Sequence, residues 1–493
     1  MASPLYIAVD LGAGSGRVFL AGVDPSDLLL EEIHRFQYPP DVESGHLRWN
    51  FPLIFGEIKA GLIKAAVRAN ELGRPVYSIG IDSWAVDYGL LDADGNLIAN
   101  PVCYRDDRTT AAMDSVFAKV SRSAIFEKTG IQFQNFNTLF QLYSEDGNLK
   151  KAAKLLLLPD LINYFLTGRA AAERTNATTT QMVNAATGNW DHELLEKLGL
   201  PAHILPEIVP TGCDLGLPKP DIATELGLPD VRVIAPATHD TASAIAGAPL
   251  SADHAYISSG TWSLIGVERD DMLTDRETAR QNFTNTGGAF GSICFLKNVM
   301  GLWVFESCRR EWKAQGVDIG YDAIISEVWA KPEFSAFIFP DDPRFLNPPS
   351  MLGAIEQQMA ETGNAFNGDP ASVAKVIFDS LAFRYASVLR TVESLTGRKL
   401  KGVEVLGGGG RNRYLNQMTA NASGLRTRSG LTEATVVGNV LVQAITAGRF
   451  SSLEMAREYV RANFEFTSFL PEPSSKIDEA AERYAAVENK FVG

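Results

Sequence analysis

Apolar and polar residues alternate along this chain in two patterns, one with the period of a strand and one with the period of a helix. Residues 51–72 carry apolar side chains at the three- and four-residue spacing of an amphipathic helix. Short apolar runs on either side of this segment predict strands over residues 7–10, 18–20, 28–36, 76–81 and 100–104. Three strands followed by an alternation of helix and strand predict a mixed sheet that is covered by helices.

The rest of the chain repeats this organisation. A strand pair is predicted over residues 255–265, further strands over 231–236 and 403–406, and helices over 110–119, 242–247, 302–312, 373–395, 413–422, 432–447 and 477–491. The run at 175–180 is polar apart from one alanine and predicts a turn or surface loop that could face a sugar. Both halves contain a strand, a glycine turn and a second strand, which indicates two domains related by duplication. At 493 residues the chain is too long for one core, and we place the domain boundary between residues 246 and 247.

Three glycine-rich turns lie between the predicted elements. They contain Gly12, Gly14 and Gly16, then Gly260 beside Thr261, and finally the four glycines at 407–410. Glycine lets backbone N–H groups approach a phosphate without a Cβ in the way. Because four glycines between a strand and a helix cost conformational entropy, we interpret 407–410 as a close approach to a flat ligand such as adenine.

The spacing of the glycines excludes two well-known phosphate loops. No stretch has the Lys and Ser/Thr that follow the last glycine of a Walker loop. The first glycine turn is followed by a predicted strand, whereas a dinucleotide-binding fold requires a helix there. A strand, a glycine turn and a second strand resemble the first phosphate loop of the actin- and hexokinase-like ATPases.

Two aspartates lie where a phosphate site needs acidic groups. Asp10 ends the first strand just before the glycine turn, where a carboxylate can hold a divalent cation beside a phosphate. Asp240 lies at a strand-to-helix junction and can take the proton from an attacking hydroxyl; the structural alternative is that Thr238 or Asp240 caps the helix. Phosphoryl transfer needs mainly alignment, charge neutralisation and one positioned base, so the set of motifs indicates a kinase.

The charge and composition exclude several other classes of function. A net charge of -14 and a pI near 5.1 argue against general binding to nucleic acids or to anionic membranes. No apolar run approaches the length of a membrane span, and the first ten residues lack the basic region of a signal peptide, so we expect a cytoplasmic protein. The four cysteines lack the spacing of a zinc site, and the oligomeric state stays open.

Ten stretches between residues 8 and 412 resemble the FGGY family of carbohydrate kinases and follow one another in that family's order. They read AVDLGAGSGRV, GIDSWAVDYGLLD, YRDDRT, GIQFQNFNTLFQL, TNATTTQ, HDTASA, SSGTWSL, LKNVMGLW, DDPRF and GGGGRN. The resemblance is strongest to the branch that phosphorylates L-rhamnulose on its 1-hydroxyl. It implies an α/β fold of two actin- or hexokinase-like (ribonuclease H-like) domains with a catalytic cleft between them, and the use of ATP and Mg²⁺. The N-terminal domain (1–246) would carry the sugar site and the first phosphate loop, and the C-terminal domain (247–493) the second phosphate loop and the adenosine motif.

The resemblance also implies roles for individual residues. Asp240 would be the proton acceptor, and Asp10 would hold Mg²⁺ through water. The sugar would be contacted by Ala85, His239, Asp240, Thr241 and Asn298. ATP would be bound by Ala13, Gly14, Ser15, Gly16, Arg17, Thr261, Glu306 and Gly408.

Three positions depart from the family's pattern. Ala85 replaces a common glycine, Glu306 replaces an expected glutamine, and Gly14 stands where the family often has serine. Ala85 keeps open the alternative that the chain is a sister kinase acting on L-fuculose or D-xylulose. A non-catalytic regulator that binds sugar or nucleotide is a second alternative, which the presence of both Asp10 and Asp240 argues against. An actin-like polymerising protein is a third, which would leave the sugar-side motifs without a purpose.

Overall fold

The computed structural model describes residues 3–25, 27–145 and 147–491, and these group into two compact units. The first unit contains Met1–Pro249, Glu268–Phe295 and Ala434–Asn463. The second contains Leu250–Val267, Leu296–Glu433 and Phe464–Gly493. The domain boundary expected between residues 246 and 247 stays a prediction.

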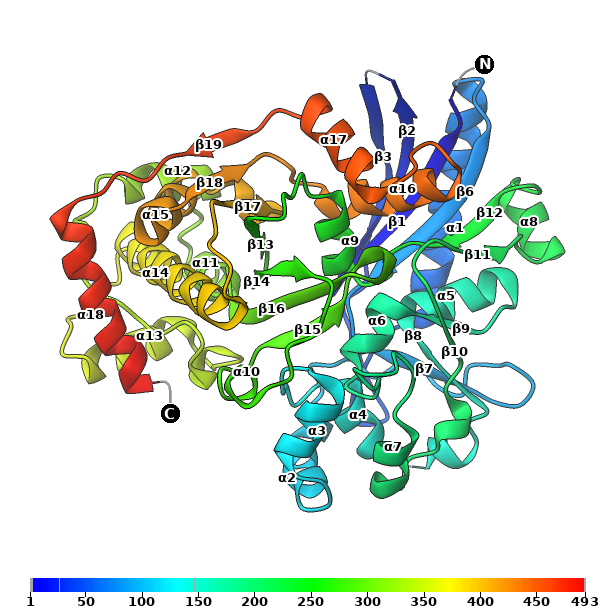
Figure 1. The fold of residues 1–493 in the computed structure, drawn as a ribbon, viewed down its shortest axis with the longest axis horizontal. Helices are drawn as coiled ribbons and strands as arrows, with labels where there is room; N and C mark the ends of the chain where they lie inside the picture. The colour runs from blue at the N-terminus through cyan, green and yellow to red at the C-terminus, as the bar shows by residue number, and fades with distance from the viewer. Residues whose placement is uncertain (1–2, 26, 146, 492–493) are drawn as a thin grey trace. The chain divides into compact units, whose positions relative to one another are not determined.

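A six-stranded mixed sheet forms the centre of the first unit (Figure 1). Its strands, in spatial order, are β11 (Cys213–Gly216), β12 (Arg232–Ala235), β6 (Val76–Ser83), β1 (Leu5–Gly12), β2 (Ser15–Asp24) and β3 (Asp27–Gln37). β1 pairs antiparallel with β2, while β1, β6 and β12 are parallel neighbours. The C-terminal ends of these three parallel strands therefore lie at the same edge of the sheet.

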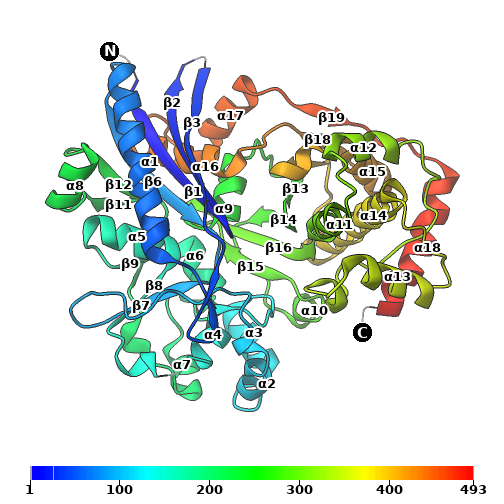
Figure 2. The same ribbon diagram turned by 180° about the vertical axis from the view of Figure 1, so that it is seen from behind.

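Helices cover both faces of this sheet, as Figures 1 and 2 show from opposite sides. On one face lies α1 (Phe51–Glu71), which begins where Asn50 Oδ1 accepts a hydrogen bond from Leu53 N. Its buried residues recur at the predicted helical spacing, so the expected helix at 51–72 is confirmed. On the other face lie α9 (Asp240–Gly247) and α16 (Ala434–Thr446). These two helices pack backbone to backbone, since a Cβ at Gly438 would lie 1.8 Å from the Ser243 carbonyl oxygen.

Smaller elements complete the first unit. The short strands are β4 (Asp41–Glu43) with β5 (His46–Arg48), β7 (Tyr88–Leu91) with β8 (Lys154–Leu157), β9 (Ala171–Glu173) with β10 (Glu207–Val209), and β15 (Thr284–Gly287). The helices are α2 (Ala112–Phe117), α3 (Arg122–Thr129), α4 (Thr138–Tyr143), α5 (Leu158–Thr167), α6 (Arg174–Thr179), α7 (His192–Leu198), α8 (Pro220–Leu226), α10 (Arg276–Arg280) and α17 (Leu453–Asn463), with 3₁₀ turns η1 (Asp107–Thr109), η2 (Asn148–Lys150), η3 (Ala202–Ile204) and η4 (Ala289–Gly291).

Two local expectations in this unit were wrong. The segment at 100–104 is not a strand, because only an isolated bridge joins Val102 to Arg48. The polar run at 175–180 is not a surface loop: it forms most of α6 and the residue after it, and it is buried. Its threonine hydroxyls are satisfied by backbone carbonyls and neighbouring side chains, which lets a polar segment fold inside.

The second unit is built on the other large sheet, which contains β14 (Trp262–Arg269), β13 (His254–Ser259), β17 (Gly402–Leu406), β18 (Arg426–Ser429) and β19 (Thr467–Phe469) in spatial order. β16 (Ile293–Met300) carries the chain into this unit. The helices are α11 (Trp303–Ala314), α12 (Tyr321–Val328), α13 (Met351–Glu361), α14 (Pro370–Thr396), α15 (Arg413–Ser423) and α18 (Ser475–Phe491), with 3₁₀ turns η5 (Pro343–Phe345) and η6 (Gly408–Arg411). The predicted strand pair at 255–265 and the predicted helices at 302–312, 373–395 and 477–491 are confirmed.

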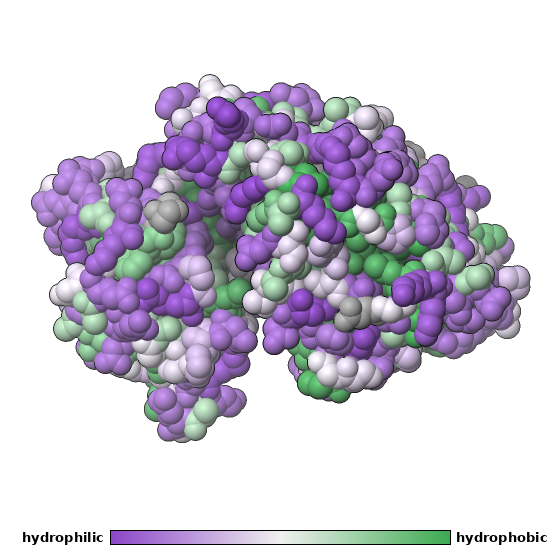
Figure 3. Space-filling model, turned by 90° about the horizontal axis from the view of Figure 1, so that it is seen from below, coloured by the Kyte–Doolittle hydropathy of each residue, from purple (hydrophilic) through white to green (hydrophobic). Residues whose placement is uncertain are grey.

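The surface is that of an ordinary globular chain. The face drawn in Figure 3 is mainly hydrophilic, and its apolar residues form smaller areas between the polar ones. In the part of the chain that the structure describes, every helix is too short or too polar to cross a bilayer.

Candidate active site

The hairpin of β1 and β2 forms a narrow turn with Ala13 and Gly14 at its tip. Gly12 and Ser15 are the last paired residues, and Gly14 has a φ of +139°. Only glycine adopts this backbone conformation without strain, which explains why this chain has glycine where serine was expected. Of the predicted phosphate residues 13–17, Ala13 and Gly14 form the turn itself, while Ser15, Gly16 and Arg17 begin β2.

Asp10 and Arg17 face each other across this hairpin. They are register partners in β1 and β2, and their side chains form an ion pair. Asp10 is only 5% exposed. Burial raises the pKa of the Asp10 carboxyl, and the positive charge of Arg17 opposes that rise.

A further buried aspartate, Asp82, lies beside Asp10 at the end of β6. The two residues are paired in the parallel register of β1 and β6. One oxygen of Asp82 accepts a hydrogen bond of 2.6 Å from Asn439 Nδ2, while the other oxygen has no hydrogen-bond partner among the described residues. Burial raises the pKa of Asp82 well above its usual range, and the neighbouring Asp10 carboxylate adds to the rise. Sequence reasoning missed this residue, although the GIDSW stretch contains it.

Asp240 is the first residue of α9 and completes a set of three carboxylates. Ser83 N donates to the Thr238 carbonyl at 2.9 Å, which ties the end of β6 to the start of this helix. The Asp240 side chain is 32% exposed and accepts a hydrogen bond of 3.1 Å from the Thr241 hydroxyl. Its enclosed position raises the pKa of Asp240 to about 6. The charge of Asp240 also raises the pKa values of Asp10 and Asp82.

The alternative that Thr238 or Asp240 caps α9 was wrong. His239 occupies the N-cap position and makes no side-chain capping bond. Thr238 is used differently, since its N–H and its hydroxyl both donate to Glu173 Oε2 at 3.0 Å. The Asp240 carboxylate is therefore not consumed by helix capping.

His239 is held as a buried neutral imidazole beside Asp240. Its Nε2 lies 3.5 Å from Asp240 Oδ1, and burial lowers the pKa of His239 to about 4. Its backbone N–H donates to Thr175 Oγ1 at 3.2 Å. Thr175 in turn donates from its backbone to Glu173, so the TNATTT stretch serves to anchor the residues around Asp240.

Ala85 lies on a sharply constrained segment after β6. It is half-buried, while the residues on both sides of it are buried. Val86 has a φ of +70°, which is rare for a β-branched residue. The Val86 carbonyl accepts from the Thr138 hydroxyl at 2.7 Å, and this bond holds the strained conformation in place.

The second unit carries the remaining predicted positions. Thr261 is exposed at the turn between β13 and β14, and its carbonyl accepts from Gly301 N at 3.2 Å and Trp303 N at 3.1 Å. Glu306 is partly exposed on α11 and forms an ion pair of 2.9 Å with Arg309. Asn298 is half-buried on β16.

The four glycines at 407–410 are only partly explained by an approaching ligand. Gly407 has a φ of +78°, and a Cβ at Gly409 would lie 2.0 Å from Ser259 Oγ. These two glycines are therefore required by the fold itself, so the interpretation that the whole run reflects a ligand was wrong for them. Gly408 is exposed, and a Cβ at this position would meet no atom within 4 Å, which leaves Gly408 open to a ligand.

Comparisons with known proteins identify the family of this chain. Residues 5–247 match the N-terminal domain of the FGGY family of carbohydrate kinases, and residues 255–447 match its C-terminal domain. The chain is 38% identical over 490 residues to the rhamnulokinase of Ligilactobacillus salivarius (strain UCC118), covering 99% of both chains. It is 40% identical over 480 residues to the rhamnulokinase of Bacteroides thetaiotaomicron, covering 96% of this chain and 97% of the relative.

Solved structures show the same fold. A gluconate kinase from Lactobacillus acidophilus superposes with a TM-score of 0.82 at 16% identity, covering 99% of both chains. The glycerol kinase of Plasmodium falciparum with ADP superposes with a TM-score of 0.80 at 14% identity, covering 99% of this chain and 98% of that one. The predicted two-domain α/β fold is confirmed.

Proposed function

The chain belongs to the FGGY family of carbohydrate kinases, and on that premise we propose that it transfers the γ-phosphate of ATP to the 1-hydroxyl of L-rhamnulose. The observation that carries the proposal is the partly exposed Asp240 carboxylate in a chain that matches rhamnulokinases over nearly its full length. The products would be ADP and L-rhamnulose 1-phosphate. The use of ATP also fits the cytoplasmic location that the sequence predicts.

Asp240 is the proton acceptor in this proposal. A pKa of about 6 leaves most of the carboxylate ionised at neutral pH while keeping it basic enough to accept a proton from a hydroxyl. Thr241 Oγ1 orients the carboxylate from the protein side. The neutral His239 adds no positive charge that would lower the basicity of Asp240.

The turn at residues 13–17 is the proposed phosphate site. Ala13 and Gly14 at its tip are half-buried and would approach the phosphate oxygens, as glycine-containing turns do in other phosphate sites. Arg17 adds the positive charge of its guanidinium, and the ion pair with Asp10 fixes the position of that side chain. Thr261, Glu306 and Gly408 of the second unit are the further proposed contacts to ATP.

The carboxylates of Asp10 and Asp82 in the first unit suit a magnesium ion. No group of three or more His, Cys, Asp or Glu side chains among the described residues is arranged to enclose a metal. Magnesium in kinases is held instead by one or two carboxylates together with waters and phosphate oxygens. Asp10, with the unpartnered oxygen of Asp82 beside it, meets this description. The ion would neutralise negative charge on the phosphates of ATP.

The sugar would be contacted by Ala85, His239, Asp240, Thr241 and Asn298. Ala85 presents a methyl group where the family commonly has glycine. The space for the ketose is therefore smaller by about a methyl group, which can change which ketose fits. The sister kinases for L-fuculose and D-xylulose remain the alternatives, and a non-catalytic regulator is the more distant one.

The test is ADP formation with L-rhamnulose, L-fuculose and D-xylulose as acceptors. Preference for L-rhamnulose by a large ratio of kcat/KM would support the proposal. Preference for another ketose would leave the kinase in place with a different substrate. Binding of ATP and sugar without turnover would overturn the proposal.

A further inference from the structure

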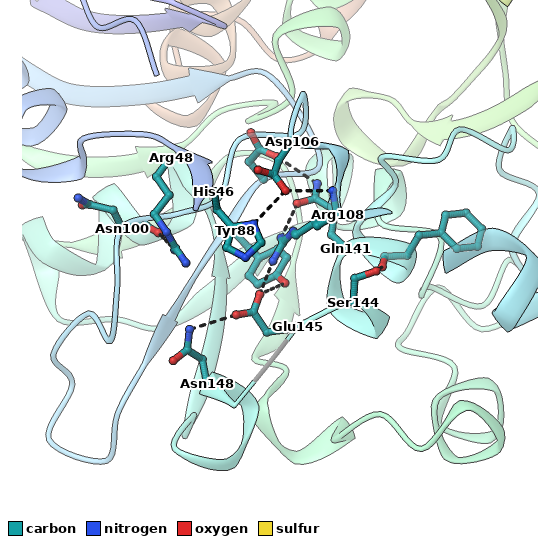
Figure 4. A network of polar contacts seen from close by, with 12 residues as sticks. His46, Arg48, Tyr88, Asn100, Asp106, Arg108, Gln141, Ser144, Glu145 and Asn148 are labelled. Carbon is teal, nitrogen blue, oxygen red and sulfur yellow. Dashed lines mark hydrogen bonds and ion pairs between the residues drawn. The ribbon is translucent and has the colours of Figure 1, made fainter. Parts of the chain in front are cut away.

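The segment YRDDRT at residues 104–109 is held rigidly by partners that are distant in the sequence. Asp106 accepts hydrogen bonds from Leu47 N at 2.8 Å and Arg108 N at 3.0 Å, and it lies 3.2 Å from His46 Nδ1. Figure 4 shows His46 and Asp106 side by side, joined by this contact. The middle of the segment is therefore fixed to β5.

Arg108 anchors the other end of the segment in a buried polar network. Its guanidinium pairs with Glu145 Oε2 at 2.6 Å and donates to Gln141 Oε1 at 3.0 Å. Glu145 also accepts from the Tyr88 hydroxyl at 3.0 Å (Figure 4). Because Arg108 and Glu145 are only 8% and 7% exposed, this pair is consumed inside the protein and is not offered to a ligand.

The backbone of the same segment is hydrogen-bonded to the loop after β6, which contains Ala85 and Asp87. Tyr104 N donates to Asp87 Oδ2 at 3.2 Å. The fully buried Asp87 carboxylate also accepts from the indole N–H groups of Trp49 at 2.6 Å and Trp84 at 2.9 Å. Several independent bonds thus fix the position of Tyr104 and of the residue that follows it.

Arg105, unlike Arg108, is not buried in an ion pair. Its side chain is exposed, and its Nη2 donates to the Ala13 carbonyl at 3.2 Å across 92 residues of sequence. Its Nε donates to the Tyr104 hydroxyl at 3.1 Å, and the guanidinium carbon lies 5.0 Å from the centre of the Tyr104 ring. No carboxylate lies within ion-pairing distance of Arg105 in the part of the chain that the structure describes.

We propose that Arg105 binds oxygens of the phosphoryl group that is transferred. Ala13 is the tip of the proposed phosphate turn, so a guanidinium that rests on its carbonyl lies at the rim of that site. Arg17 shares its charge with Asp10 through their ion pair, so a second guanidinium at this rim would add positive charge beside the phosphates. A guanidinium binds phosphate oxygens with two parallel hydrogen bonds, and a charged acceptor is a stronger partner than the neutral Ala13 carbonyl.

The role rests on the proposed function and adds no step to it. The 1-hydroxyl oxygen forms a bond to the γ-phosphorus while Asp240 takes its proton. The bond from that phosphorus to the bridging oxygen breaks, and its electron pair leaves with ADP. Arg105 would only donate hydrogen bonds to the non-bridging oxygens, which carry charge before, during and after the transfer.

The experiment compares Arg105→Gln and Arg105→Lys with the control Arg169→Gln. Arg169 is also an exposed arginine of the first unit that donates to a backbone carbonyl, that of Asp214 at 2.8 Å. We expect Arg105→Gln to lower kcat by about 10- to 100-fold, Arg105→Lys to recover part of the loss, and Arg169→Gln to stay within about twofold of wild type. Binding is measured by calorimetry with Mg-ADP and with L-rhamnulose 1-phosphate as probes. We expect weaker binding of the sugar phosphate and unchanged binding of Mg-ADP.

The possible outcomes separate this role from the proposed function. If wild type prefers another ketose, the same comparison is made with that ketose and its phosphate, so the substrate and Arg105 are tested separately. An unchanged kcat in Arg105→Gln would overturn the role. A rise in the KM of the ketose alone would assign Arg105 to a sugar hydroxyl, and a loss of Mg-ADP affinity alone would assign it to the nucleotide; both results would also overturn it.

Discussion

Asp82 lies directly opposite Asp10 in the parallel pairing of β1 and β6, and Asn439 of α16 holds it there through a hydrogen bond of 2.6 Å. Asn439 is itself fixed, since its Oδ1 accepts from Gln443 Nε2 at 2.6 Å. The close approach of this amide pair to β6 needs Gly80, because a Cβ there would lie 2.4 Å from Asn439 Oδ1. A helix more than 350 residues away in sequence thus sets the position of a carboxylate in the site.

Asn439→Ala should destabilise the protein by roughly 1–3 kcal/mol, because it leaves the buried Asp82 carboxylate without its hydrogen-bond donor. The free energy of unfolding in urea measures this. Gln417→Ala, which removes a half-buried amide that donates only to neutral oxygens, is the control and should cost less. Equal effects of the two substitutions would show that the bond to Asp82 contributes little.

Asp240→Asn should lower kcat by about 10²- to 10⁴-fold, since an amide cannot accept the proton of the hydroxyl. Steady-state ADP formation measures the loss, and calorimetry should find the binding of Mg-ADP unchanged. The control is Asp230→Asn, which changes an exposed aspartate and should leave kcat as it is. Retention of most of the activity in Asp240→Asn would remove Asp240 from the role of base.

The pH dependence of kcat/KM should have an acidic limb with an inflection near pH 6, because burial raises the pKa of Asp240 to about 6. Activity should fall tenfold per pH unit below that value and level off above it, as the carboxylate fraction rises with pH. The stability effect has the opposite sign: the raised pKa favours folding at acidic pH, and that contribution is lost as pH rises through about 6. A flat profile between pH 5 and 7 would contradict the assignment.

Gly438→Ala should destabilise the protein by at least about 2–3 kcal/mol, because the new methyl group would lie 1.8 Å from a backbone oxygen of α9. Gly56→Ala is the matched control, since Gly56 is in the interior of α1 with no atom near its Cβ position. That substitution should stabilise the helix by about 0.5–1 kcal/mol. Chemical denaturation measures the change in the free energy of unfolding for both variants. A change of the same sign in both would argue against the tight packing of α9 on α16.

Ala85→Val should raise the KM of the ketose roughly 10-fold and leave the KM of ATP unchanged, because extra methyl groups would reduce the space for the sugar. The positive φ of Val86 allows the adjacent loop little freedom to adjust. Initial rates at varied ketose and varied ATP separate the two constants. A change confined to the KM of ATP would place Ala85 outside the sugar site.

Much of the candidate site was predictable because its residues lie next to regular local patterns. The apolar runs predicted the strands that carry Asp10 and precede Asp240, and the glycine spacing predicted the turn after Asp10. The periodic helices at 51–72 and 373–395 were predicted well, since burial of one helical face leaves a clear trace in the sequence. The buried helix at 174–179 was missed because its hydroxyls are satisfied by partners that no local pattern reveals.

The sequence by itself determined the main periodic strands and helices, the glycine turn after Asp10 and membership of the kinase family, because these follow from periodicity, from backbone requirements and from residues that are contiguous in the chain. Only the tertiary structure decided that Asp82 and Asn439 belong to the site, that Glu173 anchors Thr238, and that Arg105 rests on Ala13. The physical reason is that hydrogen bonds and charge interactions act over a few ångströms of space. Which residues come that close depends on how β1, β6, α9 and α16 pack together.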